Sequence, residues 1–184
     1  LDRYATLKPA RELRYRYALH LAESGRLDRY LDLYRSYYQG LGAARLDCIA
    51  LHAEIEAGEG DRVEHRGRDL WLTGFSQADE CDPVFDWMRE EQLLTEDDYR
   101  ARFALAIEAR EFTRARWLAR SLDGSLLEQA DGWMQAQSNP QQFVESHAQR
   151  ADSDVSREQL TYALERITYR DPETALQLWQ RLES

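Results

Sequence analysis

The sequence has few lysines, prolines and cysteines, and it lacks long apolar runs. It contains 23 Arg but a single Lys, with four Pro and two Cys among 184 residues. The apolar runs are far shorter than the roughly 20 residues that cross a bilayer, so no membrane span is expected. The net charge of -10 disfavours nucleic acid and anionic membrane as partners, because their phosphates would be repelled.

Apolar side chains recur throughout at the spacing of α-helices. Leu27, Leu31, Tyr34 and Tyr38 follow one another at steps of four, three and four, which places them on one helix face. The segment 46–57 carries apolar residues on two opposite faces, so it must be packed on both sides. Inner helices of a stack of helical hairpins meet this condition.

Glycines indicate where the hairpins turn. Gly25 and Gly58 each follow a helix-like segment, suit the left-handed conformation that ends a helix, and lie 33 residues apart. This spacing is close to the period of about 34 residues in tetratricopeptide-like hairpins. A further helix around 82–91 interrupts the repeat. Asp171 before Pro172 predicts another helix start, and Thr95 with Asp98 reads as a capping pair.

The fold class expected from these patterns is all-α. We predict an irregular α-solenoid, or superhelix, of paired tetratricopeptide-like hairpins with roughly ten helices. It should form one domain over residues 1–184, and a compact helical bundle is the alternative. Because the chain begins with Leu1 and shows no secretory signal, we expect an internal piece of a longer protein.

The two cysteines, Cys48 and Cys81, are separated by 33 residues. A helical hairpin and its exit loop fit between them, so a disulfide is feasible. Two buried free thiols are the alternative, and the spacing alone leaves both open. The absence of a CxxC motif argues against a metal site.

The stretch LWLTGFSQADECDPVFDWM resembles a segment of the soluble lytic transglycosylases, and the resemblance is strongest from residue 6 to residue 122. The residues that carry it are Leu70, Trp71, Leu72, Thr73, Gly74, Ser76, Gln77, Cys81, Asp82, Phe85 and Trp87.

The resemblance implies a function that the helical pattern alone does not. Members of this family are periplasmic enzymes in which a long α-superhelix precedes a lysozyme-like catalytic domain. They cleave the MurNAc-β-1,4-GlcNAc bond of peptidoglycan to 1,6-anhydro products. The resemblance therefore implies that this chain is part of the superhelix, with a Cys48–Cys81 disulfide, a periplasmic location and no cofactor. Its partners would be glycan strands and the catalytic domain that this chain lacks.

No catalytic residue is predicted on this chain. The family places its catalytic Glu in a Glu-Ser motif followed by apolar residues, where shelter keeps the proton on the acid. The pairs here are Glu23-Ser24, Glu145-Ser146 and Glu183-Ser184, and none has that context. His52 and His65 could face each other across a hairpin, but a third metal ligand is not in view, so no metal site is expected.

Tyrosines crowd the first hairpin. Tyr30, Tyr34, Tyr37 and Tyr38 are candidates for glycan contact through ring stacking. The preferred interpretation is that residues at this helical spacing pack between helices, with their hydroxyls at the rim.

These features are compatible with three functions. The first is a scaffold segment of a lytic transglycosylase, and it is the one the resemblance favours. The second is a periplasmic helical-repeat module that binds a protein or peptide, although the Asn and Lys clamps of tetratricopeptide proteins are lacking, since the chain has one Asn and one Lys. The third, an enzyme complete within these residues, has no constellation to support it.

Overall fold

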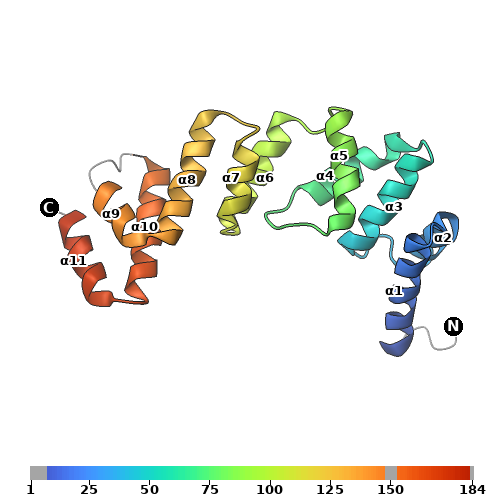
Figure 1. The fold of residues 1–184 in the computed structure, drawn as a ribbon, viewed down its shortest axis with the longest axis horizontal. Helices are drawn as coiled ribbons and strands as arrows, with labels where there is room; N and C mark the ends of the chain where they lie inside the picture. Colours follow the sequence, from blue (N-terminus) through green and yellow to red (C-terminus); the bar gives the residue numbers. More distant parts are fainter. Residues whose placement is uncertain (1–7, 148–152, 183–184) are drawn as a thin grey trace. The chain divides into compact units, whose positions relative to one another are not determined.

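The computed structural model describes residues 8–147 and 153–182, and this part of the chain is helical without strands (Figure 1). The expected all-α fold of helical hairpins is confirmed. The described residues form α1 (Lys8–Glu23), α2 (Leu27–Tyr37), α3 (Ala44–Glu56), α4 (Val63–Trp71), α5 (Asp82–Glu90), α6 (Glu96–Glu108), α7 (Phe112–Ala119), α8 (Gly124–Ser138), α9 (Pro140–His147), α10 (Asp154–Thr168) and α11 (Pro172–Leu182). Two 3-10 turns, η2 (Gly60–Arg62) and η3 (Asp79–Cys81), precede α4 and α5.

The helices belong to two compact units, residues 1–98 and 99–184. The first unit holds α1 to α5 and the start of α6, and the second holds the rest of α6 and α7 to α11. Both units are built from the same kind of helical hairpin. The single domain over residues 1–184 that the sequence suggested stays a prediction.

Left-handed residues end the helices of the first unit where the sequence predicted turns. Gly25 and Gly58 have φ angles of 68° and 79°, values that strain residues with a Cβ. After α1, the amide of Arg26 donates to the carbonyl of Leu21 at 2.9 Å, which satisfies an orphan carbonyl at the helix end. The glycines therefore allow each hairpin to reverse within a few residues.

Helix α3 is packed on both sides, as its two apolar faces predicted. One face carries Leu46 and Ala50, which pack with Tyr30 and Tyr34 of α2. The other carries the buried Cys48 and Leu51, and α3 also contacts α4, η3 and α5. This two-sided burial makes α3 the central helix of the first unit.

The second unit has an aromatic core. Phe112 of α7 stacks on Trp133 of α8, with ring centroids 5.2 Å apart, and Tyr162 of α10 meets both rings edge-on. Helix α10 packs against α8, α9 and α11. At the start of α11, Asp171 accepts a hydrogen bond from the amide of Thr174 at 3.0 Å, so the predicted cap before Pro172 is confirmed.

Candidate functional site

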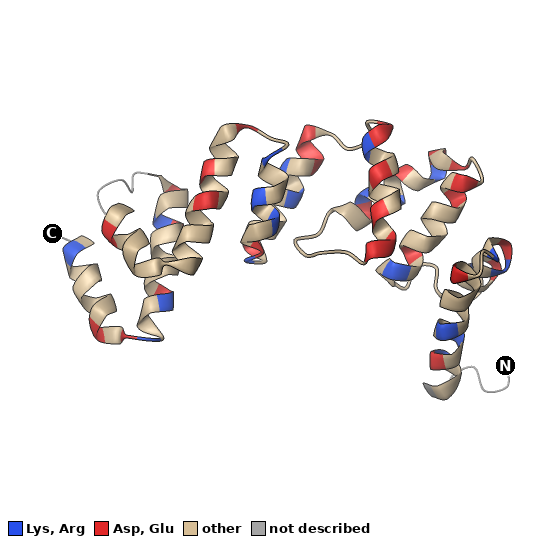
Figure 2. Ribbon diagram, in the orientation of Figure 1, with Lys and Arg blue, Asp and Glu red and all other residues tan. Residues whose placement is uncertain are grey.

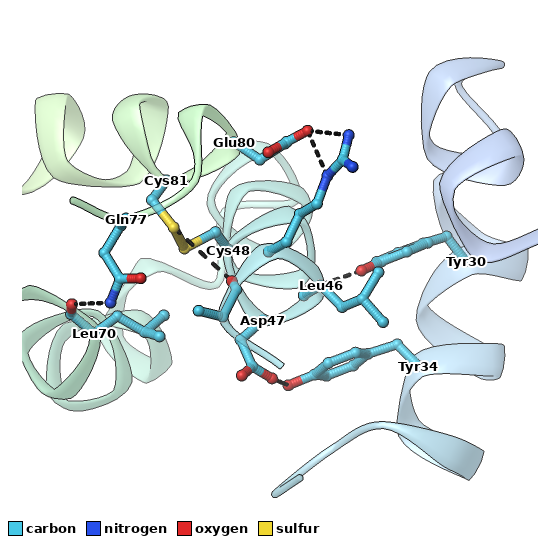
Figure 3. The surroundings of a disulfide bond; sticks show 11 residues. Tyr30, Tyr34, Leu46, Asp47, Cys48, Leu70, Gln77, Glu80 and Cys81 are labelled. Atoms are coloured by element: carbon cyan, nitrogen blue, oxygen red, sulfur yellow. Dashed lines mark hydrogen bonds and ion pairs between the residues drawn. A yellow bond between two sulfur atoms is a disulfide. The ribbon is translucent and has the colours of Figure 1, made fainter. Parts of the chain in front are cut away.

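Cys48 and Cys81 are joined by a disulfide, and both are fully buried (Figure 3). Their Cα atoms lie 4.8 Å apart. Cys48 lies on the central helix α3, and Cys81 ends η3, directly before α5. The bond therefore fixes the far end of the connection between α4 and α5 onto the centre of the first unit.

Two polar contacts hold this connection beside the disulfide. The side-chain amide of Gln77 donates to the carbonyl of Leu70 at the end of α4, at 2.8 Å (Figure 3). The guanidinium of Arg45, near the start of α3, pairs with Glu80 through Nε at 2.7 Å. The connection is thus tied to α4 at one end and to α3 at the other.

Aromatic residues flank the connection and pack the first unit. Trp71 is buried and meets the ring of Phe85 edge-on, with centroids 5.2 Å apart. The indole N–H of Trp71 donates to the carbonyl of Asp98 at 3.4 Å. The ring of Trp87 lies so close to Gly60 that a Cβ there would come within 2.8 Å of it. These contacts bring α4, α5 and the turn at η2 together.

The connection between α4 and α5 buries little apolar surface of its own. Leu72 and Phe75 leave 37% and 58% of their surface exposed, so they add little to the core. Thr73 accepts a hydrogen bond from the amide of Phe75 at 3.3 Å, whereas Ser76 and Asp82 are exposed and Gly74 is buried. The buried apolar mass belongs to the ends of α4 and α5, and the disulfide, rather than apolar packing, holds the connection.

The candidate glycan-contacting tyrosines fall into two pairs. Tyr30 and Tyr34 are buried between α2 and α3, and their hydroxyls donate to the carbonyl of Leu46 and to a carboxylate oxygen of Asp47, each at 2.6 Å (Figure 3). A buried ring cannot stack on a sugar. The preferred core interpretation agrees with this, but the hydroxyl of Tyr30 lies inside the core and not at its rim.

The surroundings of these hydroxyls keep them protonated. Burial raises the pKa of the Tyr30 hydroxyl well above its usual value, and the nearby Tyr34 and Asp47 raise it further. Burial, together with the hydrogen bond to Asp47, raises the pKa of Tyr34 to about 12. Both hydroxyls therefore serve as hydrogen-bond donors in the core.

Tyr37 and Tyr38, at the end of α2, are half-buried and remain candidates for glycan contact. The guanidinium carbon of Arg14 lies 4.0 Å from the centroid of the Tyr37 ring, a cation–π arrangement. Burial raises the pKa of the Tyr38 hydroxyl, although the positive charge of Arg14 acts in the opposite direction.

Neither Glu-Ser pair within the described residues has the shelter that an acid catalyst needs. Glu23 and Glu145 are both solvent-exposed. The adjacent Ser24 and Ser146 hydroxyls donate to backbone carbonyls of their own helices, at 2.6 and 2.8 Å. The third pair, Glu183-Ser184, lies outside the described residues.

The histidines do not form a shared site. His52 lies 3.9 Å from Glu56 and His65 lies 3.7 Å from Asp69, each on its own helix. In the part of the chain that the structure describes, no group of three or more His, Cys, Asp or Glu side chains is arranged to hold a metal ion. The helices of residues 8–147 and 153–182 also include none with the length and apolarity to cross a membrane.

The helical-hairpin fold recurs in solved structures of one class of protein. The 70 kDa soluble lytic transglycosylase from Escherichia coli superposes with a TM-score of 0.68 at 24% identity, covering 98% of this chain and 29% of that one. A lytic transglycosylase from Pseudomonas aeruginosa, in an inactive variant, superposes with a TM-score of 0.60 at 28% identity, with the same coverage.

Sequence comparison points to the same class. The chain is 25% identical over 170 residues to the soluble lytic murein transglycosylase of Escherichia coli K12, a match that covers 92% of this chain. The protein of strain O157:H7 matches equally well. No protein-family model matches the chain. The resemblance to the soluble lytic transglycosylases, which the 70–87 segment first indicated, is thus confirmed along almost the whole chain. The chain spans only 26% of the length of these relatives.

Proposed function

We propose that this chain is a superhelical scaffold segment of a periplasmic peptidoglycan lytic transglycosylase. The parent protein cleaves the MurNAc-β-1,4-GlcNAc bond to 1,6-anhydro-muropeptides, and this segment shapes the frame and guides glycan strands. The proposal rests on the sequence match, which covers 92% of this chain and 26% of the Escherichia coli enzyme.

The disulfide supports the periplasmic part of the proposal. Disulfides form and persist in oxidising compartments such as the periplasm, and they are rare in the cytosol. Cys48 and Cys81 are joined and fully buried, and the bond links α3 to η3 in the first unit. A frame that works outside the cytoplasm gains stability from such a cross-link without metal or cofactor.

The character of the side chains supports the scaffold role. The buried tyrosines, the 70–87 segment and the disulfide all connect helices, and the described Glu-Ser pairs are exposed. On this proposal the catalytic acid lies in the lysozyme-like domain of the parent protein, and that domain is a partner of the superhelix.

Digestion of purified peptidoglycan sacculi tests whether this chain is a scaffold without catalytic activity of its own. The purified chain is incubated with sacculi, and soluble products are analysed by mass spectrometry for 1,6-anhydro-muramic acid, with the Escherichia coli enzyme as the positive control. We expect release by the control alone. Anhydro products released by this chain would overturn the scaffold assignment and place a catalytic acid on it.

A further inference from the structure

The second unit carries a groove that none of the assignments above uses. Two pockets of about 340 and 530 Å³ adjoin along α6, because both are lined by Ile107, Glu108 and Glu158. Helices α7, α8 and α10 supply the other walls. We call this surface the α6–α10 groove and define it by Phe103, Ile107, Glu108, Phe112, Trp133 and Glu158.

The floor of the groove is apolar and contains a hydrogen-bond donor without an acceptor. Phe103, Phe112 and Trp133 are buried core residues that line it. Trp133 is only 7% exposed, and its indole N–H has no hydrogen-bond partner among the described residues. A buried donor without an acceptor is unfavourable, so a small rotation of the ring that brings this N–H to an acceptor on a ligand would be favoured.

The charges around the groove are unevenly matched. Each of its arginines is close to a carboxylate: Arg100 to Asp123 at 2.8 Å, Arg157 to Asp154 at 2.8 Å, and Arg110 to Glu165 at 3.9 Å. Glu108 and Glu158, which line both pockets, are exposed and have no ion-pair partner in the described part of the chain. The centre of the groove is therefore negative and open to a cation.

These features match a peptide better than a sugar. The aromatic rings of the floor are buried in the core and expose little of their faces, whereas sugars stack on open ring faces. An extended peptide offers backbone carbonyls to an unpaired N–H and an amine to two carboxylates. Its apolar side chains can contact the half-buried Ile107 and Leu126 beside the floor. Stacked helical hairpins often bind such segments.

We propose that the α6–α10 groove binds an extended segment of a partner protein that carries a lysine flanked by apolar residues. The lysine ammonium lies between Glu108 and Glu158, and a backbone carbonyl accepts from Trp133. From Arg100 to Glu108, α6 runs for about 12 Å at 1.5 Å per residue. About four steps of 3.3 Å between extended residues cover this length, and four steps join the five residues of a pentapeptide.

Titration of the isotope-labelled chain with a short peptide tests the proposal. The probe is acetyl-Leu-Ala-Lys-Ala-Leu-amide, and the matched control peptide has norleucine in place of lysine. The readout is the indole N–H resonance of Trp133, identified as the signal lost in a Trp133→Phe variant. We expect this resonance and the amides of α6, α8 and α10 to shift with the lysine peptide, and the norleucine peptide to bind at least about threefold more weakly.

Surface variants keep the result independent of core packing. The double variant Glu108→Gln with Glu158→Gln should weaken binding of the lysine peptide by about three- to tenfold, because it removes both carboxylates. Glu128→Gln, on an exposed part of α8 outside the groove, should leave binding unchanged.

Three outcomes would overturn the proposal. They are an unmoved Trp133 resonance at millimolar peptide, equal binding of the two peptides, or a response only to an oligosaccharide of N-acetylglucosamine, which would make the groove a glycan site. Because the test uses no sacculi, its outcome is separate from that of the proposed function.

Discussion

The helices of the two units are held together by different kinds of contact. In the first unit, the helices are connected by specific cross-links: a disulfide, two buried tyrosine hydroxyls and the ion pair of Arg45 with Glu80. The second unit has no cysteine, and it relies on the Phe112–Trp133–Tyr162 cluster and the aliphatic residues around it. Acidic and basic residues are intermixed along the helices of both units (Figure 2).

The lengths of the connections between helices account for this difference. A long connection between α4 and α5 leaves Leu72 and Phe75 exposed, so covalent and polar links must hold it. In the described part of the second unit, the connections between helices are shorter, and aromatic rings fill the interior. The first unit is organised around its central helix α3.

The largest expected effect is on the aromatic cluster. Phe112→Ala removes a buried ring that contacts Trp133 and Tyr162, with ring centroids 5.2 and 5.4 Å away, and should destabilise the second unit by about 3–5 kcal/mol. Amide hydrogen exchange should rise in α7, α8 and α10 and stay unchanged in α1 to α5. Tyr169→Ala, at a side chain 92% exposed in the same unit, is the control. Equal loss of protection in both units would contradict the comparison.

Removing the disulfide should destabilise the first unit and leave the second unchanged. The double variant Cys48→Ala with Cys81→Ala opens a loop of 33 residues, which should cost the first unit about 3–4 kcal/mol in the chain-entropy model. Exchange should rise in α3 and α5, and wild-type protein in reductant should behave alike. Since the second unit contains no cysteine, faster exchange in α8 or α10 would show that the units are not separately stabilised.

A smaller effect is expected at the tyrosine hydroxyl in the core of the first unit. Tyr30→Phe removes the hydrogen bond to the carbonyl of Leu46 and should cost about 0.5–1.5 kcal/mol in urea unfolding. Tyr17→Phe, at an exposed position on α1, serves as the matched control and should change nothing measurable. If the two variants unfold alike, the buried hydroxyl is not one of the links that hold α2 to α3.

The smallest expected effect is the loss of the α8 cap at low pH. Hydrogen bonds from the Ser125 hydroxyl, Arg100 and the amide of Leu126 lower the pKa of Asp123 from 3.8 to about 2. Because the folded pKa lies below the unfolded one, the cap stabilises α8 above pH 3.8, and the effect is lost as the pH falls towards 2. NMR titration of the Asp123 carboxyl should give a midpoint near 2. In Arg100→Gln the midpoint should move upward, and a wild-type midpoint of 3.8 would refute the cap.

Local signals in the sequence were sufficient for the turns and caps. Gly25 and Gly58 end helices in the left-handed conformation, and Thr95 exchanges hydrogen bonds with Asp98, as expected. These features depend on residues within one or two helical turns. The resemblance also implied the Cys48–Cys81 disulfide, which the spacing of the two cysteines alone left undecided.

Features that depend on how helices pack against one another could not be predicted from the sequence. The partner of the Tyr30 hydroxyl is the carbonyl of Leu46, sixteen residues away, and its identity depends on the approach of α2 to α3. The exposure of Phe75 likewise depends on how the connection lies against the helices, which no local pattern specifies. Glu108, Trp133 and Glu158 carry no motif, and only the packing of α6, α8 and α10 brings them to one groove.

Co-sedimentation of the purified chain with peptidoglycan sacculi across a salt series tests the account most directly. The chain carries a net charge of -10, so contact with an acidic polymer has to come from stacking and hydrogen bonds, which salt screens little. The account predicts that the chain sediments with sacculi to the same extent at low and high salt. A chain that stays in the supernatant, or that is released as salt rises, would contradict the claim that this segment guides glycan strands.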